Sequence, residues 1–114
     1  MTSNVTVTGV EGGQLIVWTL SANESGVPQS YAYYPLRSVQ IAGTFSGASV
    51  LLEGSNDLTN PTNWNTLRNA HGDLLQVSGP SLSMTDDTPL WTRARIEGGD
   101  DLTHITIHLL AQHS

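Results

Sequence analysis

The chain has 114 residues, no cysteine, and a formal charge of −6 that comes from ten acidic residues and only four basic ones, all of them arginine. A chain of this length forms one domain with one core, and the missing cysteines exclude a disulfide framework and a thiolate metal site. So few basic residues argue against a nucleic-acid-binding surface and against docking on an anionic membrane.

Residues 1–13 are polar and contain glycine, so we expect an N-terminal arm or an edge strand there. Residues 14–20 follow as a firmer strand, with Ile16, Trp18 and Leu20 on one face and Leu15 and Val17 on the other. Apolar residues on both faces indicate a strand that is covered on both sides. No basic segment or apolar run at the start indicates a signal peptide, and no run approaches the roughly 20 residues of a membrane span.

A loop over 21–29 leads to a cluster of aromatic residues that precedes Arg37. The cluster consists of Tyr31, Tyr33 and Tyr34. One interpretation is that a tyrosine caps the core while the others line a turn. The other is an interface patch, because tyrosine and arginine are frequent anchors of binding surfaces.

Residues 38–67 show the clearest alternation of apolar and polar residues in the chain. Apolar residues recur at every second position in 39–45 and again in 48–52, and Gly47 and the run 54–57 interrupt them. This pattern predicts half-buried antiparallel strands separated by turns.

The last third predicts two further strands. In 90–97, Leu90, Thr92, Ala94 and Ile96 face one way, and Trp91, Arg93, Arg95 and Glu97 face the other way. The run 98–101 is predicted to be a hairpin turn. In 103–109 the residues Thr103, Ile105, Ile107 and Leu109 are predicted to point inward.

Seven to eight strands at spacings of about 8–12 residues are typical of an antiparallel sandwich. We therefore predict an all-β protein with a single antiparallel, jelly-roll-like β-sandwich over 14–114, preceded by an extended N-terminal segment.

No residue pattern indicates catalysis, a cofactor or a metal centre. His104 and His108 lie four apart on a predicted strand, about 13 Å from one another, which is too far for one metal ion. The aspartate pairs 86–87 and 100–101 lie in turns and lack the spacing of a calcium loop. The sequence therefore predicts a protein that is not an enzyme.

The outward face of 90–97 is the most informative surface, because Trp91, Arg93 and Arg95 share it. Two interpretations stand: the arginines pair with local carboxylates such as Glu53 or Glu97, or they dock a neighbouring chain together with Trp91.

Two runs carry a resemblance to a known family. They are GTFSGASVLLEGSND at 43–57, followed by Trp64, and WTRARIEGGD at 91–100. Together they resemble small β-sandwich head decoration, or cement, proteins of tailed bacteriophages, and they are partly similar to discoidin-like sandwiches. The resemblance covers roughly residues 39–110.

The resemblance to decoration proteins implies a virion protein on the outer capsid surface that binds the major capsid protein and assembles as a homo-trimer. Its expected contact residues are Tyr31, Tyr33, Tyr34, Arg37, Trp91, Arg93 and Arg95. A carbohydrate-binding or tail-associated adhesin module is the alternative, with Trp64, Trp91 or a tyrosine as a platform for sugar rings. A structural protein of the tail tube or baseplate is a third hypothesis.

Overall fold

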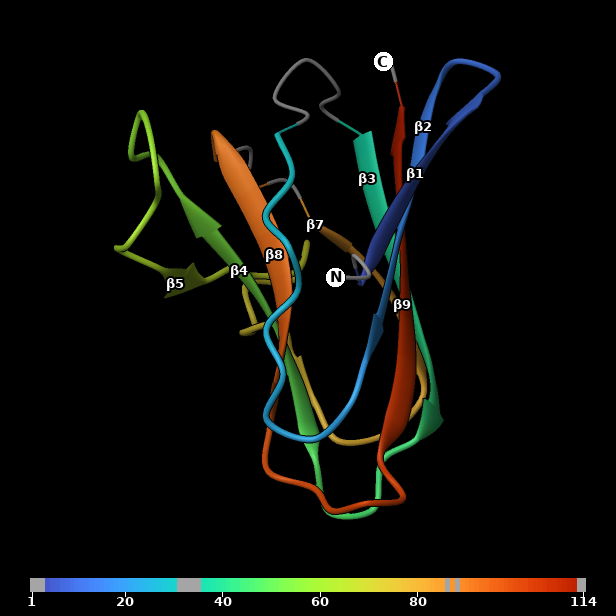
Figure 1. The fold of residues 1–114 in the computed structure, drawn as a ribbon. Coiled ribbons are helices and arrows are strands. Elements are labelled where there is room, and N and C mark those ends of the chain that lie inside the picture. The colour runs from blue at the N-terminus through green and yellow to red at the C-terminus, as the bar shows by residue number, and fades with distance from the viewer. Residues whose placement is uncertain (1–3, 31–35, 86, 88, 113–114) are drawn as a thin grey trace.

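The computed structural model describes residues 4–30, 36–85, 87 and 89–112 (Figure 1). Nine strands lie in these residues, every strand pairing is antiparallel, and no helix occurs among them. The strands form two sheets that pack against each other, so the predicted all-β, sandwich-like fold is confirmed.

The larger sheet has five strands in the order β1-β2-β9-β3-β7. These strands are β1 (Val5–Val10), β2 (Gly13–Leu20), β3 (Leu36–Thr44), β7 (Ser81–Thr85) and β9 (His104–Gln112). β1 forms an edge of this sheet and pairs with β2 along its whole length. The N-terminal segment is thus a strand of the sheet from residue 5 onward.

The smaller sheet is built around β4 (Ser49–Ser55), which pairs with three other strands. They are β5 (Asn65–Thr66), β6 (Gln76–Val77) and β8 (Trp91–Glu97). β5 and β6 contain only two residues each, which is too short to give an alternation in the sequence. For this reason the expected count of seven to eight strands was too low.

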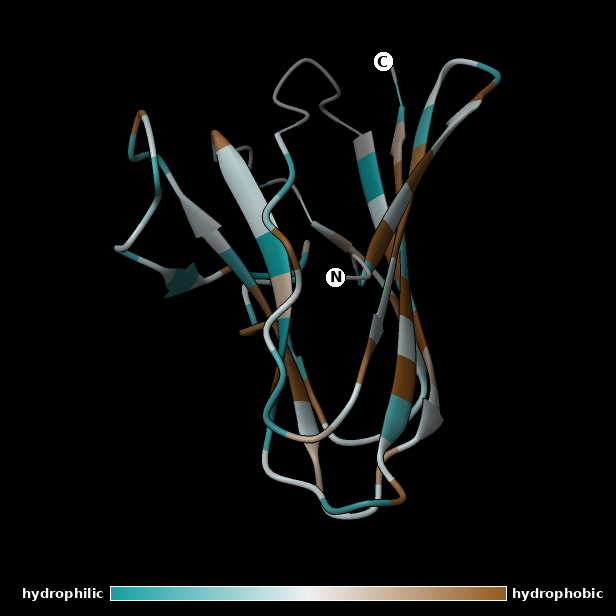
Figure 2. Cartoon of the chain, in the orientation of Figure 1, coloured by the Kyte–Doolittle hydropathy of each residue, from teal (hydrophilic) through white to brown (hydrophobic). Residues whose placement is uncertain are grey.

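The core lies between the sheets and follows the period-two pattern of the strands (Figure 2). In β2 the buried residues are Ile16, Trp18 and Leu20, and in β9 every second residue from Ile105 to Ala111 is buried. The four-stranded sheet contributes Val50, Leu52, Ala94 and Ile96. The predicted inward faces of 90–97 and 103–109 are confirmed, because their inward residues are buried from Thr92 onward in the first segment and from Thr103 onward in the second.

The predicted hairpin at 98–101 is wrong. β8 belongs to the four-stranded sheet and β9 to the five-stranded sheet, so this segment crosses from one layer to the other. Gly98 and Gly99 have φ of 82° and 93°, in the left-handed region that glycine favours, and they turn the chain sharply. The crossing is joined to the neighbouring β3–β4 connection, because Ser46 Oγ donates to Asp100 Oδ1 at 2.7 Å.

The described part of the connection between β2 and β3, residues 21–30, runs along the outer edge of β8, as Figure 1 shows. Isolated bridges join Ser25 to Arg95 and Gln29 to Thr92. The buried Trp18 anchors this connection, because its Nε1 donates to the carbonyl of Val27 at 2.9 Å. The edge of β8 is therefore covered by the chain itself.

Candidate functional site

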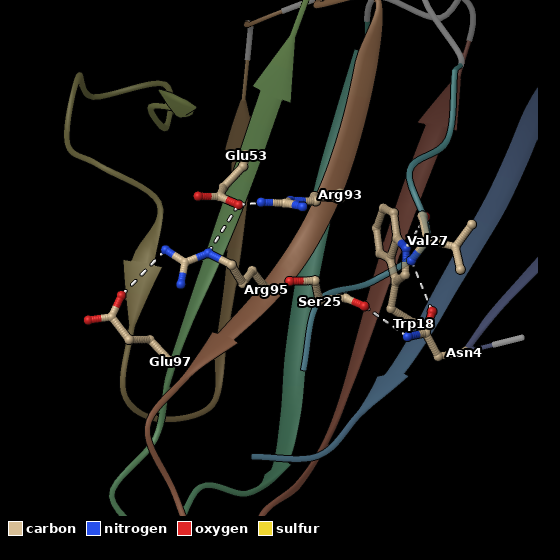
Figure 3. A network of polar contacts seen from close by, with 8 residues as sticks. All are labelled: Asn4, Trp18, Ser25, Val27, Glu53, Arg93, Arg95 and Glu97. Carbon is tan, nitrogen blue, oxygen red and sulfur yellow. Dashed lines mark hydrogen bonds and ion pairs between the residues drawn. The ribbon is translucent and has the colours of Figure 1, made fainter. Parts of the chain in front are cut away.

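The outer face of the four-stranded sheet carries a group of charged and aromatic side chains, which we call the arginine–tryptophan cluster. It consists of Glu53, Trp64, Arg93, Arg95 and Glu97 (Figure 3 shows all but Trp64). Strand alternation places the cluster there: with Thr92, Ala94 and Ile96 buried in the core, the residues between them must point outward. The predicted faces of this strand are correct.

Glu53 is the centre of the cluster. It lies on β4 directly opposite Arg93 of β8, and Leu51 lies opposite Arg95. One oxygen of Glu53, Oε1, accepts from Nε of Arg93 at 3.0 Å and from Nε of Arg95 at 3.2 Å (Figure 3). The Glu53 side chain is only 7% exposed, whereas the two arginines are 20% and 29% exposed. One largely buried carboxylate therefore fixes two partly exposed cations.

Each arginine has a second contact that orients it. The guanidinium carbon of Arg93 lies over the ring of Trp64, 4.2 Å from the ring centroid, in cation–π geometry. A terminal nitrogen of Arg95, NH2, lies 3.4 Å from Oε2 of Glu97, whose side chain is 60% exposed. The terminal nitrogens of Arg93 have no hydrogen-bond partner among the described residues. Arg93 is thus held by its Nε atom and its flat face, while its outer donors remain available.

Trp91 lies on the same face of β8 but is half-buried. Its Nε1 donates to the backbone carbonyl of Asp57 at 2.9 Å and ties down the loop that joins β4 to β5. The Asp57 carboxylate accepts from the backbone N–H groups of Thr62 at 2.9 Å and Asn63 at 3.0 Å. The backbone hydrogen bond from Asn63, and to a smaller extent the one from Thr62, lower the pKa of Asp57. Trp91 therefore supports the loop beside the cluster.

A polar hollow of about 410 Å³ lies next to this loop. Its lining is rich in amide side chains and consists of Gly54, Ser55, Asn56, Asp57, Asn63, Asn65, Leu67 and Pro89. Hydrogen-bonding groups of this kind suit a neutral, hydroxyl-rich ligand better than an apolar one.

The remaining predicted contact residues lie elsewhere. Arg37 points into the core side of the five-stranded sheet, is 1% exposed, and donates from NH1 to the carbonyl of Asp87 at 2.7 Å. Its guanidinium is therefore not presented to a partner in this conformation. Tyr31, Tyr33 and Tyr34 lie outside the described residues. Of the seven expected contact residues, the structure brings together Trp91, Arg93 and Arg95 on one face.

In one of the two interpretations of this face, the arginines pair with local carboxylates such as Glu53 or Glu97, and both carboxylates form these ion pairs. The contact between Trp64 and Arg93 was not expected from the sequence. The available signal was indirect: Trp64 immediately precedes β5, and Thr66 of β5 pairs with Glu53. Only the lateral pairing of β5, β4 and β8 brings Trp64 across the sheet to Arg93.

Among the described residues, no group of three or more histidine, aspartate or glutamate side chains is placed to hold a metal ion. The same part of the chain has no helix long and apolar enough to span a membrane.

Comparison of the chain with protein-family models found no matching family, and comparisons with curated proteins and with solved structures found no match. The likeness to phage decoration proteins therefore rests on the sequence motifs alone. The class that the structure defines is an all-β, sandwich-like domain with a charged and aromatic cluster on one sheet face.

Proposed function

We propose that this chain is a head decoration protein of a tailed bacteriophage. It binds the outer surface of the capsid and stabilises contacts between major capsid protein subunits, so it resides on the virion. The motifs in 43–57 and 91–100 support this function, and both runs contribute residues to the arginine–tryptophan cluster. The proposal includes a jelly-roll-like topology for the sandwich.

The observation that carries the proposal is the way Arg93 is held. Tryptophan and arginine are the residues most often found at the energetic centres of protein interfaces. Ordering a flexible side chain on binding costs about 0.5–1.5 kcal/mol, and Glu53 and Trp64 have already ordered Arg93 in the free protein. Its two outward terminal nitrogens form a fork that fits a carboxylate or a pair of carbonyl oxygens of a capsid subunit.

The architecture suits a role as a bridge. Two packed sheets form a stiff body, and the β2–β3 connection and the loop at Trp91 are both tied to the smaller sheet. A protein that stiffens joints between capsid subunits needs such rigidity, because a flexible linker would follow the movement of the subunits instead of resisting it.

The test is binding to phage heads that lack this protein. Wild-type protein should co-sediment with such heads and raise the temperature at which they break open. Arg93→Gln should weaken binding about 10- to 30-fold, as expected for the loss of an interface anchor. Arg68→Gln is the matched control, because Arg68 is exposed and lies outside the cluster, and its guanidinium donates to the carbonyl of Gly72.

Two results would contradict the proposal. One is wild-type protein that fails to bind heads or leaves their heat resistance unchanged. The other is an Arg93→Gln variant that binds as tightly as the Arg68→Gln control.

The polar hollow favours a second candidate, a carbohydrate-binding or tail-associated adhesin module. Asn56, Asn63 and Asn65 offer amide groups for sugar hydroxyls, and Trp64 immediately precedes β5. This candidate ranks second because Arg93 already covers one face of the Trp64 ring. A glycan-binding screen decides: selective binding that Asn65→Ala abolishes and Arg93→Gln leaves intact would favour the adhesin.

A further inference from the structure

Among the described residues, the outer face of the five-stranded sheet carries no aspartate, glutamate, lysine or arginine, although the chain as a whole has fourteen of them. We call it the uncharged face. Strand register defines its members, because each pairs laterally with another outward residue. They are Thr6, Thr8, Val10, Gly13, Leu15, Val17, Thr19, Ser38, Gln40, Ala42, Thr44, Leu82, Met84, His104, Thr106, His108, Leu110 and Gln112. None is aspartate, glutamate, lysine or arginine.

Two outward rows cross all five strands of this face. One row is Thr6, Val17, His108, Gln40 and Leu82, and the other is Thr8, Leu15, Leu110, Ser38 and Met84. Leu82 and Met84 are among the exposed large hydrophobic residues, with 71% and 52% of their surface accessible. A solvated sheet face normally carries charged residues; this face has none and adds the apolar Leu15, Val17, Leu82, Met84 and Leu110 to its polar residues, which favours a face that is covered.

One polar atom near the centre of the face is already shielded from solvent. Nδ1 of His108 is buried between its neighbours and has no hydrogen-bond partner among the described residues. Val17 and Gln40 lie opposite His108 on the two adjacent strands. Because this atom has already lost its water, covering His108 with another surface adds no further desolvation cost at Nδ1.

From this composition we infer that the uncharged face binds a second copy of the chain, face to face. Each copy has a net charge of −6, so two copies repel one another overall, and a contact surface without acidic side chains keeps that repulsion small. The uncharged face is such a surface. Sheet faces of equal twist also pack on one another at about −30°, and a two-fold axis makes such a contact self-complementary.

The size of the face is adequate for a stable dimer. Five strands at about 4.8 Å spacing span roughly 24 Å, and the eight residues of β2 span about 26 Å. The resulting flat footprint is roughly 600 Å², and protruding side chains add to this area. It approaches the approximately 800 Å² per partner of a standard interface. The expected assembly is therefore a two-fold dimer, in contrast to the trimer that the family resemblance implies.

The test compares two isosteric substitutions that add the same charge to opposite faces. Gln40→Glu places a carboxylate on the uncharged face, and Gln76→Glu places one on the exposed outer face of β6. Thr19→Glu, at the exposed position of β2, provides a second variant of the uncharged face. Light scattering after size exclusion and sedimentation velocity report the mass of each protein over a wide concentration range.

Wild-type protein and Gln76→Glu should reach twice the 12.2 kDa mass of one chain. Gln40→Glu and Thr19→Glu should raise the dimer dissociation constant at least about tenfold, because an unpaired carboxylate is buried in each half of the contact. Circular dichroism should show all four proteins folded.

Wild-type protein that stays monomeric at every concentration would overturn the inference. So would a dimer or trimer that Gln76→Glu disrupts and Gln40→Glu leaves intact. A monomer whose binding to phage heads falls in Gln40→Glu would assign the face to the capsid and would overturn it as well. The mass measurements use purified protein alone, so they are independent of the capsid-binding test.

Discussion

The Nε atom of Arg93 lies 3.0 Å from Oε1 of Glu53, and that carboxylate is almost fully removed from water. The same oxygen also accepts from Arg95, so a single buried carboxylate pairs with two guanidinium groups. An ion pair of two exposed side chains contributes about 0–1 kcal/mol to stability, whereas removal of one partner of a buried pair costs several times more. The acidic side chains around Arg95 should therefore differ strongly in importance.

We expect Glu53→Ala to destabilise the protein by about 2 kcal/mol. This value lies below the approximately 3–5 kcal/mol of a fully buried pair, because water can reach the partly exposed guanidinium groups that remain. Glu97→Ala is the matched control, since it removes the exposed acidic partner of the same Arg95 and should cost under about 0.5 kcal/mol. Chemical denaturation measures both values, and equal losses would show that Glu53 is not the anchor of the cluster.

Much of this cluster could be predicted from the sequence. The alternation in 90–97 placed Trp91, Arg93 and Arg95 on one face, and the few carboxylates nearby limited the choice of partners. The sheet to which each strand belongs could not be predicted, because a period of two tells which residues share a face and not which strands are neighbours. The Gly-Gly-Asp-Asp run shows the same limit, since a hairpin and a crossing between sheets both need a sharp turn.

Asn4 joins the start of the chain to the β2–β3 connection (Figure 3). Its Nδ2 donates to the carbonyl of Ser25 at 3.0 Å, and its Oδ1 accepts from the backbone N–H of Val27 at 2.9 Å. We expect Asn4→Ala to cost about 1–2 kcal/mol, because two hydrogen bonds are lost. Asn4→Asp keeps the acceptor for Val27 but sets a carboxylate oxygen against the carbonyl of Ser25, so it should also be less stable than wild type.

Thermal and urea unfolding of the two variants measure this effect. Hydrogen exchange should also become faster at the Val27 amide in Asn4→Ala, while the Gln29 amide, which bonds to the carbonyl of Thr92, keeps its protection. A stability of Asn4→Ala equal to that of wild type would mean that the N-terminal strand does not brace this connection.

Asp57 and Asp100 should make the protein less stable in acid. Backbone donation from Asn63 and Thr62 lowers the pKa of Asp57, and the hydroxyl of Ser46 lowers the pKa of Asp100. A lowered pKa favours the charged form in the folded state. The stabilisation is therefore complete above the unfolded-state pKa of about 3.9 and is lost as the pH falls through the lower folded-state pKa.

Urea unfolding at neutral pH and at steps below about pH 4 should show this loss in the wild type. Asp57→Asn keeps one acceptor oxygen but has no carboxylate to protonate, so its unfolding free energy should fall less steeply in this range. An acid dependence as steep as that of wild type in the double variant Asp57→Asn/Asp100→Asn would assign the loss to other groups.

Gly26 is where the β2–β3 connection comes closest to the core. Its N–H donates to the carbonyl of Ala94 at 2.7 Å, and a Cβ atom at this position would lie 2.5 Å from Cδ1 of the fully buried Trp18. Gly26→Ala should therefore destabilise the protein by about 1–3 kcal/mol, the usual cost of overpacking. The Trp18 ring would have to shift, and its hydrogen bond to Val27 would weaken with it.

Gly79→Ala provides the matched control, because a Cβ atom there meets nothing within 4 Å and the backbone of Gly79 is not in the left-handed region. This change should be neutral or slightly stabilising, since alanine restricts the unfolded chain more than glycine does. Tryptophan fluorescence and denaturant unfolding measure both variants. If Gly26→Ala were as stable as Gly79→Ala, the connection could move away from Trp18 at little cost, and its cover over the edge of β8 would be loose.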